Sequence, residues 1–256
     1  FNSIAIDGPA GAGKSSLARR LSKELGYIYV DTGAIYRSVG LAAHRRGLDT
    51  KNEIAVSAML PEISIEMRYN DEGEQRMFLD GEDVSAEIRM PEISICASNV
   101  SAMPAVRAYL LEMQRRMART HNVIMDGRDI GTVVLPDAEL KIFLTASAAA
   151  RAQRRLLELQ GKSVKADYDE VLRDIEYRDK QDTSRAAAPL KAAEDAVRVD
   201  TARRSFGASC GSGWAYEEAY CRKKCGILLR REQIRENGGG AAPQRRKVQQ
   251  PRRAYP

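Results

Sequence analysis

Apolar residues follow two alternating periods along roughly the first 200 residues of the chain. Short apolar runs, typical of buried strands, cover residues 3–6, 27–30, 123–125, 140–144 and 196–199. Apolar residues at helical spacing cover segments between these runs, at residues 17–25, 34–46, 52–60, 104–117, 148–159 and 167–185. Five strands separated by helices predict an α/β fold with a doubly wound, five-stranded parallel sheet. Ligands of such sheets bind at the carboxyl ends of the strands.

One segment departs from this alternation. Residues 62–69 and 75–79 show period-two alternation on either side of the turn-prone sequence NDEGE. Two such runs around a glycine-containing loop are typical of a β-hairpin. The sequence therefore predicts a small antiparallel insert at about residues 61–84.

A glycine-rich loop joins the first predicted strand to the first helix. Gly8, Gly13, Lys14 and Ser15 match the pattern of glycine, four residues, glycine, lysine, and serine or threonine. Glycines let successive N–H groups turn inward, and the unpaired N–H groups of the helix start favour anions. A glycine-rich turn that only caps a helix is the alternative, but the apolar strand before the loop favours a nucleotide site. The segment predicted to bind ATP comprises Gly8, Pro9, Ala10, Gly11, Ala12, Gly13, Lys14, Ser15 and Ser16.

Two side chains of this loop carry chemistry of their own. We expect Lys14 to be exposed and to reach the β- and γ-phosphates, and the Ser15 hydroxyl to complete a Mg²⁺ shell. A phosphate loop identifies a superfamily and not a substrate.

The net charge of +6 is unevenly distributed over the 256 residues. Residues 201–256 hold 13 Lys and Arg against 4 Glu, a net charge of +9, which leaves −3 for residues 1–200. No apolar run reaches the roughly 18 residues of a membrane span, so we expect a cytoplasmic protein with no membrane partner. The spacing of the four cysteines predicts neither disulfides nor zinc, since it fits no common ligand pattern.

Several motifs occur together in one order: GPAGAGKSS, DTGAIYR at residues 31–37, LDGEDVSAEIR at 79–89, DGRDIGTVVLPDA at 126–138 and SRAAAPL at 184–190. With them, about residues 3–201 resemble the bacterial cytidylate kinases, a branch of the nucleoside monophosphate kinase family. The resemblance implies a kinase domain over residues 1–204, with a helical lid at about 151–165. It also implies transfer of the γ-phosphate of ATP to CMP, and to dCMP, with Mg²⁺ as cofactor.

The resemblance also implies roles for individual residues. Those that contact the acceptor phosphate are Thr32, Arg37, Arg128 and Arg178. Those that contact the nucleoside are Ser98, Arg107, Asp129 and Arg185 at the cytosine, and Asp182 at the ribose. The lid arginines that close over the transferring phosphate are Arg151, Arg154 and Arg155. The predicted catalytic residues are Lys14, Arg128, Arg154 and Arg178.

The residue types suit this chemistry. Arginine stays charged and can bind phosphate with two donors. Cytosine presents an amino donor beside acceptor atoms, so a carboxylate for the amino group and Arg or Ser for the acceptors would complement it. Solvated polar positions on exposed helix faces are the alternative for Ser98, Asp182 and the lid arginines.

Other classes of protein fit less well. An adenylate or shikimate kinase would share the loop and the lid but would lack the DGRD and SRAAAPL motifs. A UMP kinase remains an alternative. A regulatory GTPase would need an N-K-x-D segment, which the chain lacks. Nucleic-acid binding would need a basic face in the body, whose net charge is −3. One sequence does not decide the oligomeric state, and we expect a monomer.

The basic tail, residues 205–256, departs from the family. The family has an amphipathic helix there, whereas this segment is rich in Gly, Ser, Arg and Lys with one short apolar run. We expect disorder toward its end. A basic binding extension and an out-of-frame translation both fit this segment.

Overall fold

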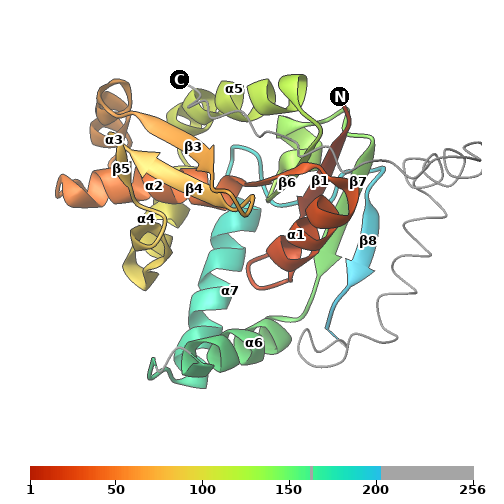
Figure 1. Ribbon diagram of the computed structural model, residues 1–256. Coiled ribbons are helices and arrows are strands. Elements are labelled where there is room, and N and C mark those ends of the chain that lie inside the picture. The colour runs from red at the N-terminus through yellow and green to blue at the C-terminus, as the bar shows by residue number, and fades with distance from the viewer. Residues whose placement is uncertain (162–163, 203–256) are drawn as a thin grey trace, which may run out of the picture. The chain divides into compact units, whose positions relative to one another are not determined.

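The structure is a computed structural model that describes residues 1–161 and 164–202 (Figure 1). The predicted basic tail and residues 162–163 of the predicted lid lie outside the described residues. At the centre is a five-stranded sheet of order β2-β6-β1-β7-β8 in which each pairing is parallel. Its strands are β1 (Ser3–Asp7), β2 (Ile28–Asp31), β6 (Val123–Gly127), β7 (Leu140–Thr145) and β8 (Val197–Asp200). The predicted parallel sheet is therefore confirmed.

Strand β1 is the middle strand, so the loop that follows it opens at the centre of the sheet's carboxyl edge. Its side chains alternate between the two faces. Ala5 joins the core beneath α2 (Thr32–Arg45) and α5 (Pro104–Thr120), and the fully buried Ile4 and Ile6 point to the opposite face. Helix α1 (Lys14–Leu25) contacts β1, β2 and β6.

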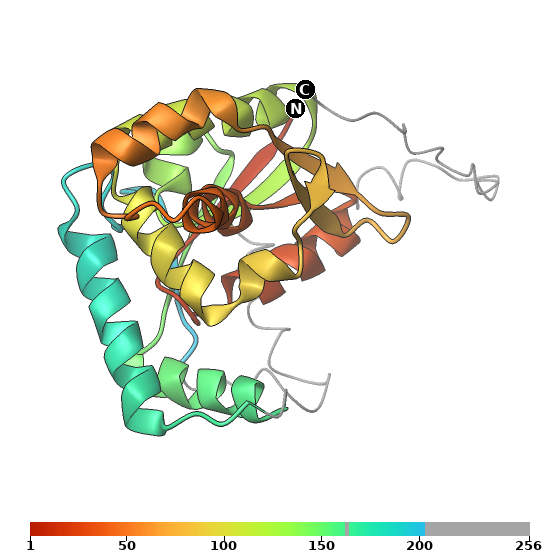
Figure 2. The ribbon, with the colours of Figure 1, turned by 90° about the vertical axis from the view of Figure 1, so that its left-hand side faces the viewer.

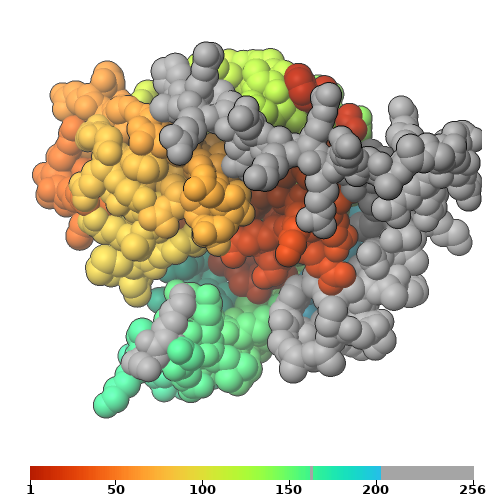
Figure 3. All heavy atoms as spheres, in the orientation of Figure 1, coloured from red at the N-terminus to blue at the C-terminus, as the bar shows by residue number. Residues whose placement is uncertain are grey.

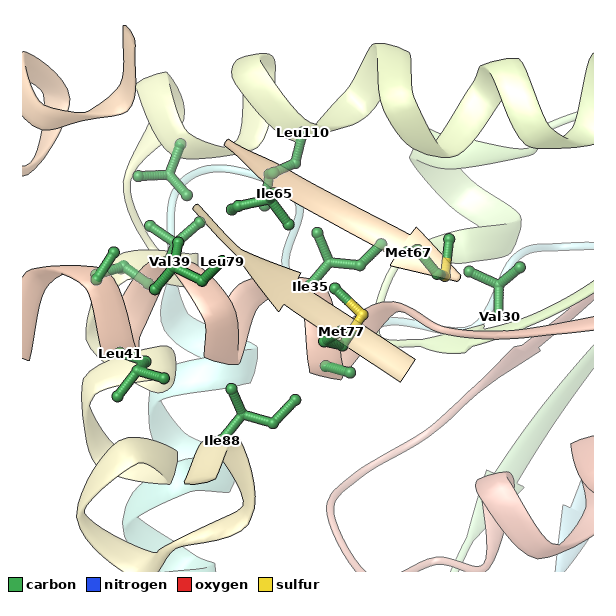
Figure 4. Close-up of a cluster of buried hydrophobic side chains, with 14 of the residues drawn as sticks. Val30, Ile35, Val39, Leu41, Ile65, Met67, Met77, Leu79, Ile88 and Leu110 are labelled. Atoms are coloured by element: carbon green, nitrogen blue, oxygen red, sulfur yellow. The ribbon is translucent and has the colours of Figure 1, made fainter. Parts of the chain in front are cut away.

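The predicted antiparallel insert is confirmed and has a third, two-residue strand. It consists of β3 (Ile65–Tyr69), β4 (Gln75–Leu79) and β5 (Glu82–Asp83). Figure 4 shows its apolar side chains facing Ile35 and Val39 of α2. These residues belong to the same core cluster as the main sheet, so the insert packs as an integral part of this core.

The helices around the insert pack closely. Helix α4 (Pro91–Ser101) packs along α2, and α3 (Glu53–Met59) contacts α5, which begins at Pro104 as expected for a proline at the first helical position. At Gly40 of α2 a Cβ would lie 2.8 Å from the backbone N of Ala97 in α4. Glycine is therefore required for this approach.

The predicted lid, at about residues 151–165, lies largely within α6 (Ala148–Gly161). Helix α6 and the start of α7 (Tyr168–Ser184) pack together around a small apolar cluster of Ala152, Val171 and Ile175. Figure 2 shows α7 running along the side of the described part of the chain to reach α6, and in Figure 3 the atoms of both helices form a lobe beneath α4 and α1. The Asp167 carboxylate begins α7 by accepting the N–H groups of Asp169 and Glu170.

Candidate active site

The loop after β1 has the backbone geometry of a phosphate cradle. Gly8, Gly11 and Gly13 have φ values of 146°, 74° and 91°, a region that favours glycine. At Gly8 a Cβ would lie 2.3 Å from the carbonyl oxygen of Leu144, so the loop fits closely against β7. Gly13 caps α1, whose first N–H groups face the loop. The arrangement can bind an anion.

Lys14 is buried, with 7% of its surface exposed, and the expectation of an exposed loop lysine was wrong. Its Nζ donates to the carbonyl oxygen of Pro9 at 2.7 Å. Burial, and then the charge of Arg128, lower the pKa of Lys14. The reason for the burial is tertiary, because side chains from distant segments close over the loop. An incoming phosphate would favour the charged form of the lysine.

Ser15 lies against Asp126, the fourth residue of β6. The Ser15 hydroxyl donates to Asp126 Oδ2 at 2.9 Å, and the Tyr29 hydroxyl donates to Oδ1 at 3.0 Å. Burial, and then the charge of Asp31, raise the pKa of Asp126. A hydroxyl and a buried carboxylate beside a phosphate loop are the hard oxygen donors that suit Mg²⁺. Within the described ranges, no group of three or more His, Cys, Asp or Glu side chains could hold a metal, so phosphate oxygens and water would complete the shell.

The start of α2 presents Thr32 and Arg37. Thr32 is buried and its hydroxyl donates to the carbonyl oxygen of Asp126 at 2.7 Å. Arg37 donates through Nη2 to Asp31 at 2.9 Å, and its Nε is buried without a hydrogen-bond partner. A Cβ at Gly33 would lie 3.1 Å from both Asp31 Oδ1 and Arg37 Nη1, so the glycine leaves room for this pair. The unused Nε is a donor available to an anion.

Arg128 and Asp182 form the next pair. Arg128 donates through Nε to Asp182 Oδ2 at 2.6 Å, and both side chains are largely buried. Burial alone would raise the pKa of Asp182, but Arg128 and Arg185 outweigh it and hold this pKa below its usual value. Asp182 is fixed further because its carbonyl oxygen accepts the N–H of Leu190 at 2.7 Å. The SRAAAPL segment thus closes back onto α7.

Asp129 lies between two arginines. Its carboxylate accepts a hydrogen bond from Arg107, and Arg185 Nη2 lies 3.6 Å from the other carboxylate oxygen. Asp129 is 3% exposed, and Arg185 Nη2 is buried without a hydrogen-bond partner. Arg107 also lies over the Tyr36 ring at 5.5 Å. A buried acceptor beside unused donors can recognise a polar ring edge.

Ser98 and Arg178 lie apart from this cluster and share a cavity between α4 and α7. The cavity has a volume of about 240 Å³, and it is also lined by Lys51, Asn99 and Tyr177. Arg178 lies within electrostatic reach of Arg128 and Asp182. Arg178 therefore couples the cavity electrostatically to the Arg128 pair, although neither Arg128 nor Asp182 lines it.

The arginines of α6 have partners in this structure. Arg151 is buried, pairs with Asp179 through both terminal nitrogens, and donates to the carbonyl oxygen of Ala10 at 3.1 Å. Arg154 donates to Thr201 after β8, and Arg155 pairs with Glu158. Arg151 thus links the phosphate loop to α7.

Comparison with known proteins gives the assignment. The family model "Cytidylate kinase" matches residues 4–211. A cytidylate kinase from Pelotomaculum thermopropionicum is 53% identical over 200 residues, 78% of this chain and 88% of that protein. The chain belongs to the cytidylate kinase family. A cytidylate kinase from Lactobacillus johnsonii is 50% identical over 198 residues, 77% of this chain and 86% of that protein.

The likeness to solved structures is weaker. The alignment with a gluconokinase from Sinorhizobium meliloti 1021 covers 93% of this chain and 98% of the gluconokinase chain, with 13% identity and a TM-score of 0.42. These values are too low to add to the family assignment. Among the described residues, no helix of this cytidylate kinase family member is long and apolar enough to cross a membrane.

Three carboxylates of the site were missed by the sequence analysis: Asp7, Asp31 and Asp126. Each stands at or beside the carboxyl end of a strand in the sheet. That position was the available signal, because acidic residues seldom end buried strands without a partner there. The identity of the partners needed the strand order, which periodicity does not give.

Proposed function

We propose that this chain transfers the γ-phosphate of ATP to CMP, giving CDP and ADP, and accepts dCMP as well. The observation that supports cytosine as the base is the buried carboxylate of Asp129. This carboxylate, flanked by Arg107 and Arg185, complements a ring edge that presents an amino donor beside acceptor atoms. Family membership supports the same substrate.

The chemistry asks for positioning and charge neutralisation. The acceptor is an anionic phosphate oxygen, so no general base has to remove a proton. The glycine loop and Lys14 would hold the ATP phosphates. Arg37, Arg128 and Arg178 would hold the acceptor phosphate, and Arg154 would reach the transferring group when α6 approaches. Thr32 and Ser98 would add neutral contacts to the phosphate and the base, and Asp182 would bind the ribose.

Ser15 and Asp126 would hold Mg²⁺, which supplies charge neutralisation between the β- and γ-phosphates when bound. The residues present suit this role because their oxygens lie 2.9 Å apart beside the loop. We also propose that the kinase acts in the cytoplasm as a monomer, which sedimentation at assay concentration would check.

A coupled ADP-release assay with ATP and Mg²⁺, run in parallel on CMP, dCMP, UMP and AMP, tests the proposal. We expect CMP turnover of roughly 1 to 100 per second, as is usual for kinases. We expect kcat/KM for UMP to be lower by about tenfold or more, because its carbonyl replaces the amino group that Asp129 would accept. Equal or better use of UMP or AMP would contradict the assignment.

A further inference from the structure

Asp7, the last residue of β1, has a carboxylate that no step of the proposed reaction uses. It is 4% exposed and lies in register with Gly127 of β6 and Phe143 of β7. Burial raises the pKa of Asp7 to about 6, against the lowering effect of two backbone N–H groups. A buried carboxylate costs stability unless it is satisfied, so its partners indicate what it does.

Those partners are the first two N–H groups of a π-helical turn, Ile130–Val134, which starts directly after Asp129. Asp7 Oδ1 accepts from Ile130 N at 2.8 Å, and Oδ2 accepts from Gly131 N at 2.7 Å. The first N–H groups of a helical turn have no partner within the turn. Asp7 therefore caps the turn from a position 123 residues earlier in the chain.

The residue that normally caps such a turn stands immediately before it, and here that residue is Asp129. The Asp129 side chain makes no capping hydrogen bond, while its carbonyl oxygen accepts the N–H of Val133 at 2.8 Å. Because Asp7 satisfies the N–H groups, the Asp129 carboxylate is free to point at Arg107 and Arg185. A local cap would instead turn Asp129 back onto its own backbone.

The fit between Asp7 and the turn is close. A Cβ at Gly131 would lie 3.4 Å from Asp7 Oδ2 and 3.1 Å from the Lys141 side chain. The next residue after Asp7 is Gly8, the first glycine of the phosphate loop. One residue thus connects the loop that holds the phosphate donor to the turn that orients Asp129.

We propose that Asp7 is a positioning residue for base selection: by capping the Ile130–Val134 turn from β1, it holds the Asp129 carboxylate at the cytosine amino group. The proposal rests on the function proposed above, in which Asp129 reads the base. It differs from a role of Asp7 in ATP binding, where the loss would fall on the KM for ATP and on CMP and UMP alike.

The test is a double-mutant cycle on the ratio of kcat/KM for CMP to kcat/KM for UMP. Asp129→Asn should lower this ratio by about tenfold, because an amide donor faces the amino group of CMP but suits the carbonyl of UMP. Asp7→Ala should lower it by about fivefold, the usual scale for loss of a cap. The double variant should show about the tenfold loss of Asp129→Asn alone, since Asp7 acts through Asp129.

Two further variants guard against a general loss of structure. Asp7→Asn keeps one acceptor oxygen, so its ratio should lie between those of the wild type and Asp7→Ala. Asp167→Ala removes another carboxylate that accepts two N–H groups at a helix start, and it should lower the melting temperature without changing the ratio. The KM for ATP should stay within about twofold in Asp7→Asn, because the loop backbone is retained.

The outcomes separate the two proposals. A multiplied loss of about fiftyfold in the double variant would show independent action and overturn the positioning role. An unchanged ratio in both Asp7 variants, with a raised KM for ATP, would also overturn it while leaving the base-reading role of Asp129 intact. An unchanged ratio in Asp129→Asn would overturn that base-reading role, and the role of Asp7 with it.

Discussion

The two sides of the active site carry buried carboxylates with opposite pKa shifts. On the phosphate-loop side, burial raises the pKa values of Asp7 and Asp126. On the acceptor side, burial acts in the same direction on Asp31 and Asp182, but neighbouring arginines outweigh it and hold both pKa values low. Depth of burial alone therefore does not separate the two sides.

The difference lies in the supply of positive charge. The loop side has Lys14, whose pKa is itself lowered by burial, and its carboxylates are incompletely neutralised. On the acceptor side, Arg37 and Arg128 each form an ion pair with a carboxylate, and Arg185 lies beside two carboxylates. Two donor atoms there, Arg37 Nε and Arg185 Nη2, are buried without hydrogen-bond partners. The loop side is suited to gain a cation together with ATP, and the acceptor side is suited to gain an anion.

Removing the lysine from the loop side should have the largest effect on this comparison. We expect Lys14→Ala to lower kcat with CMP by about a thousandfold, the scale for loss of one preorganised charge at a transferring phosphoryl group. Its melting temperature should not fall, because burial already disfavours the charged form of Lys14. Steady-state kinetics and a thermal melt measure both.

Lys23→Ala is the matched control, since Lys23 stands exposed in the last turn of the same helix, α1. It should retain wild-type kinetics. If Lys14→Ala also turned over at close to the wild-type rate, the assignment of the loop as the phosphate-donor site would be wrong.

The opposite pKa shifts predict opposite pH dependences of stability. The pKa of Asp7 is raised from about 3.8 to about 6, so its contribution to stability is present below about pH 3.8 and is lost as the pH rises through about 6. In Asp7→Asn this loss is absent, so the free energy of unfolding of the variant relative to wild type should rise by about 2 kcal/mol from pH 4 to pH 7.

Asp182→Asn should behave in the opposite sense. The pKa of Asp182 is lowered, so its contribution is present at neutral pH and is lost as the pH falls below its ordinary value of 3.8. The destabilisation by this variant should be largest at neutral pH and shrink only in acid. Urea unfolding at a series of pH values measures both differences, and parallel profiles for the two variants would contradict the comparison.

The same two sides differ in how far the sequence predicts them. The loop side is contiguous: the glycines at positions 8, 11 and 13 specify local backbone conformations, and apolar periodicity predicts the strand before them and the helix after them. The burial of Lys14 was missed because Arg128, Asp126 and Asp182, which surround it, come from distant segments.

The acceptor side is assembled from residues between Asp31 and Arg185, and no spacing in the sequence brings them together. The family resemblance supplied its arginines, but the carboxylates that hold them needed the strand order β2-β6-β1. The turn at Ile130–Val134 was missed because its sequence, IGTVV, has the apolar and β-branched residues of a strand. Its helical form depends on the cap by Asp7, a long-range contact.

The smallest effect we expect concerns the shape of the acceptor arginines. Arg37→Lys keeps the positive charge beside Asp31 but removes the planar fork, including the buried Nε that has no partner. If that Nε binds the acceptor phosphate, the KM for CMP should rise by about tenfold, the usual scale for one charge-assisted hydrogen bond. The KM for ATP should stay unchanged, because the loop side is untouched.

Arg45→Lys provides the control within the same helix. Arg45 also pairs with carboxylates, Glu82 and Glu87, but this pairing is on the surface and away from the site. This variant should leave both KM values at wild type, since a surface ion pair contributes little and contacts no substrate. An equal rise in the KM for CMP and the KM for ATP in Arg37→Lys would mean that Arg37 supports the whole site through Asp31. The division into a side that binds a cation and a side that binds an anion would then be wrong at this residue.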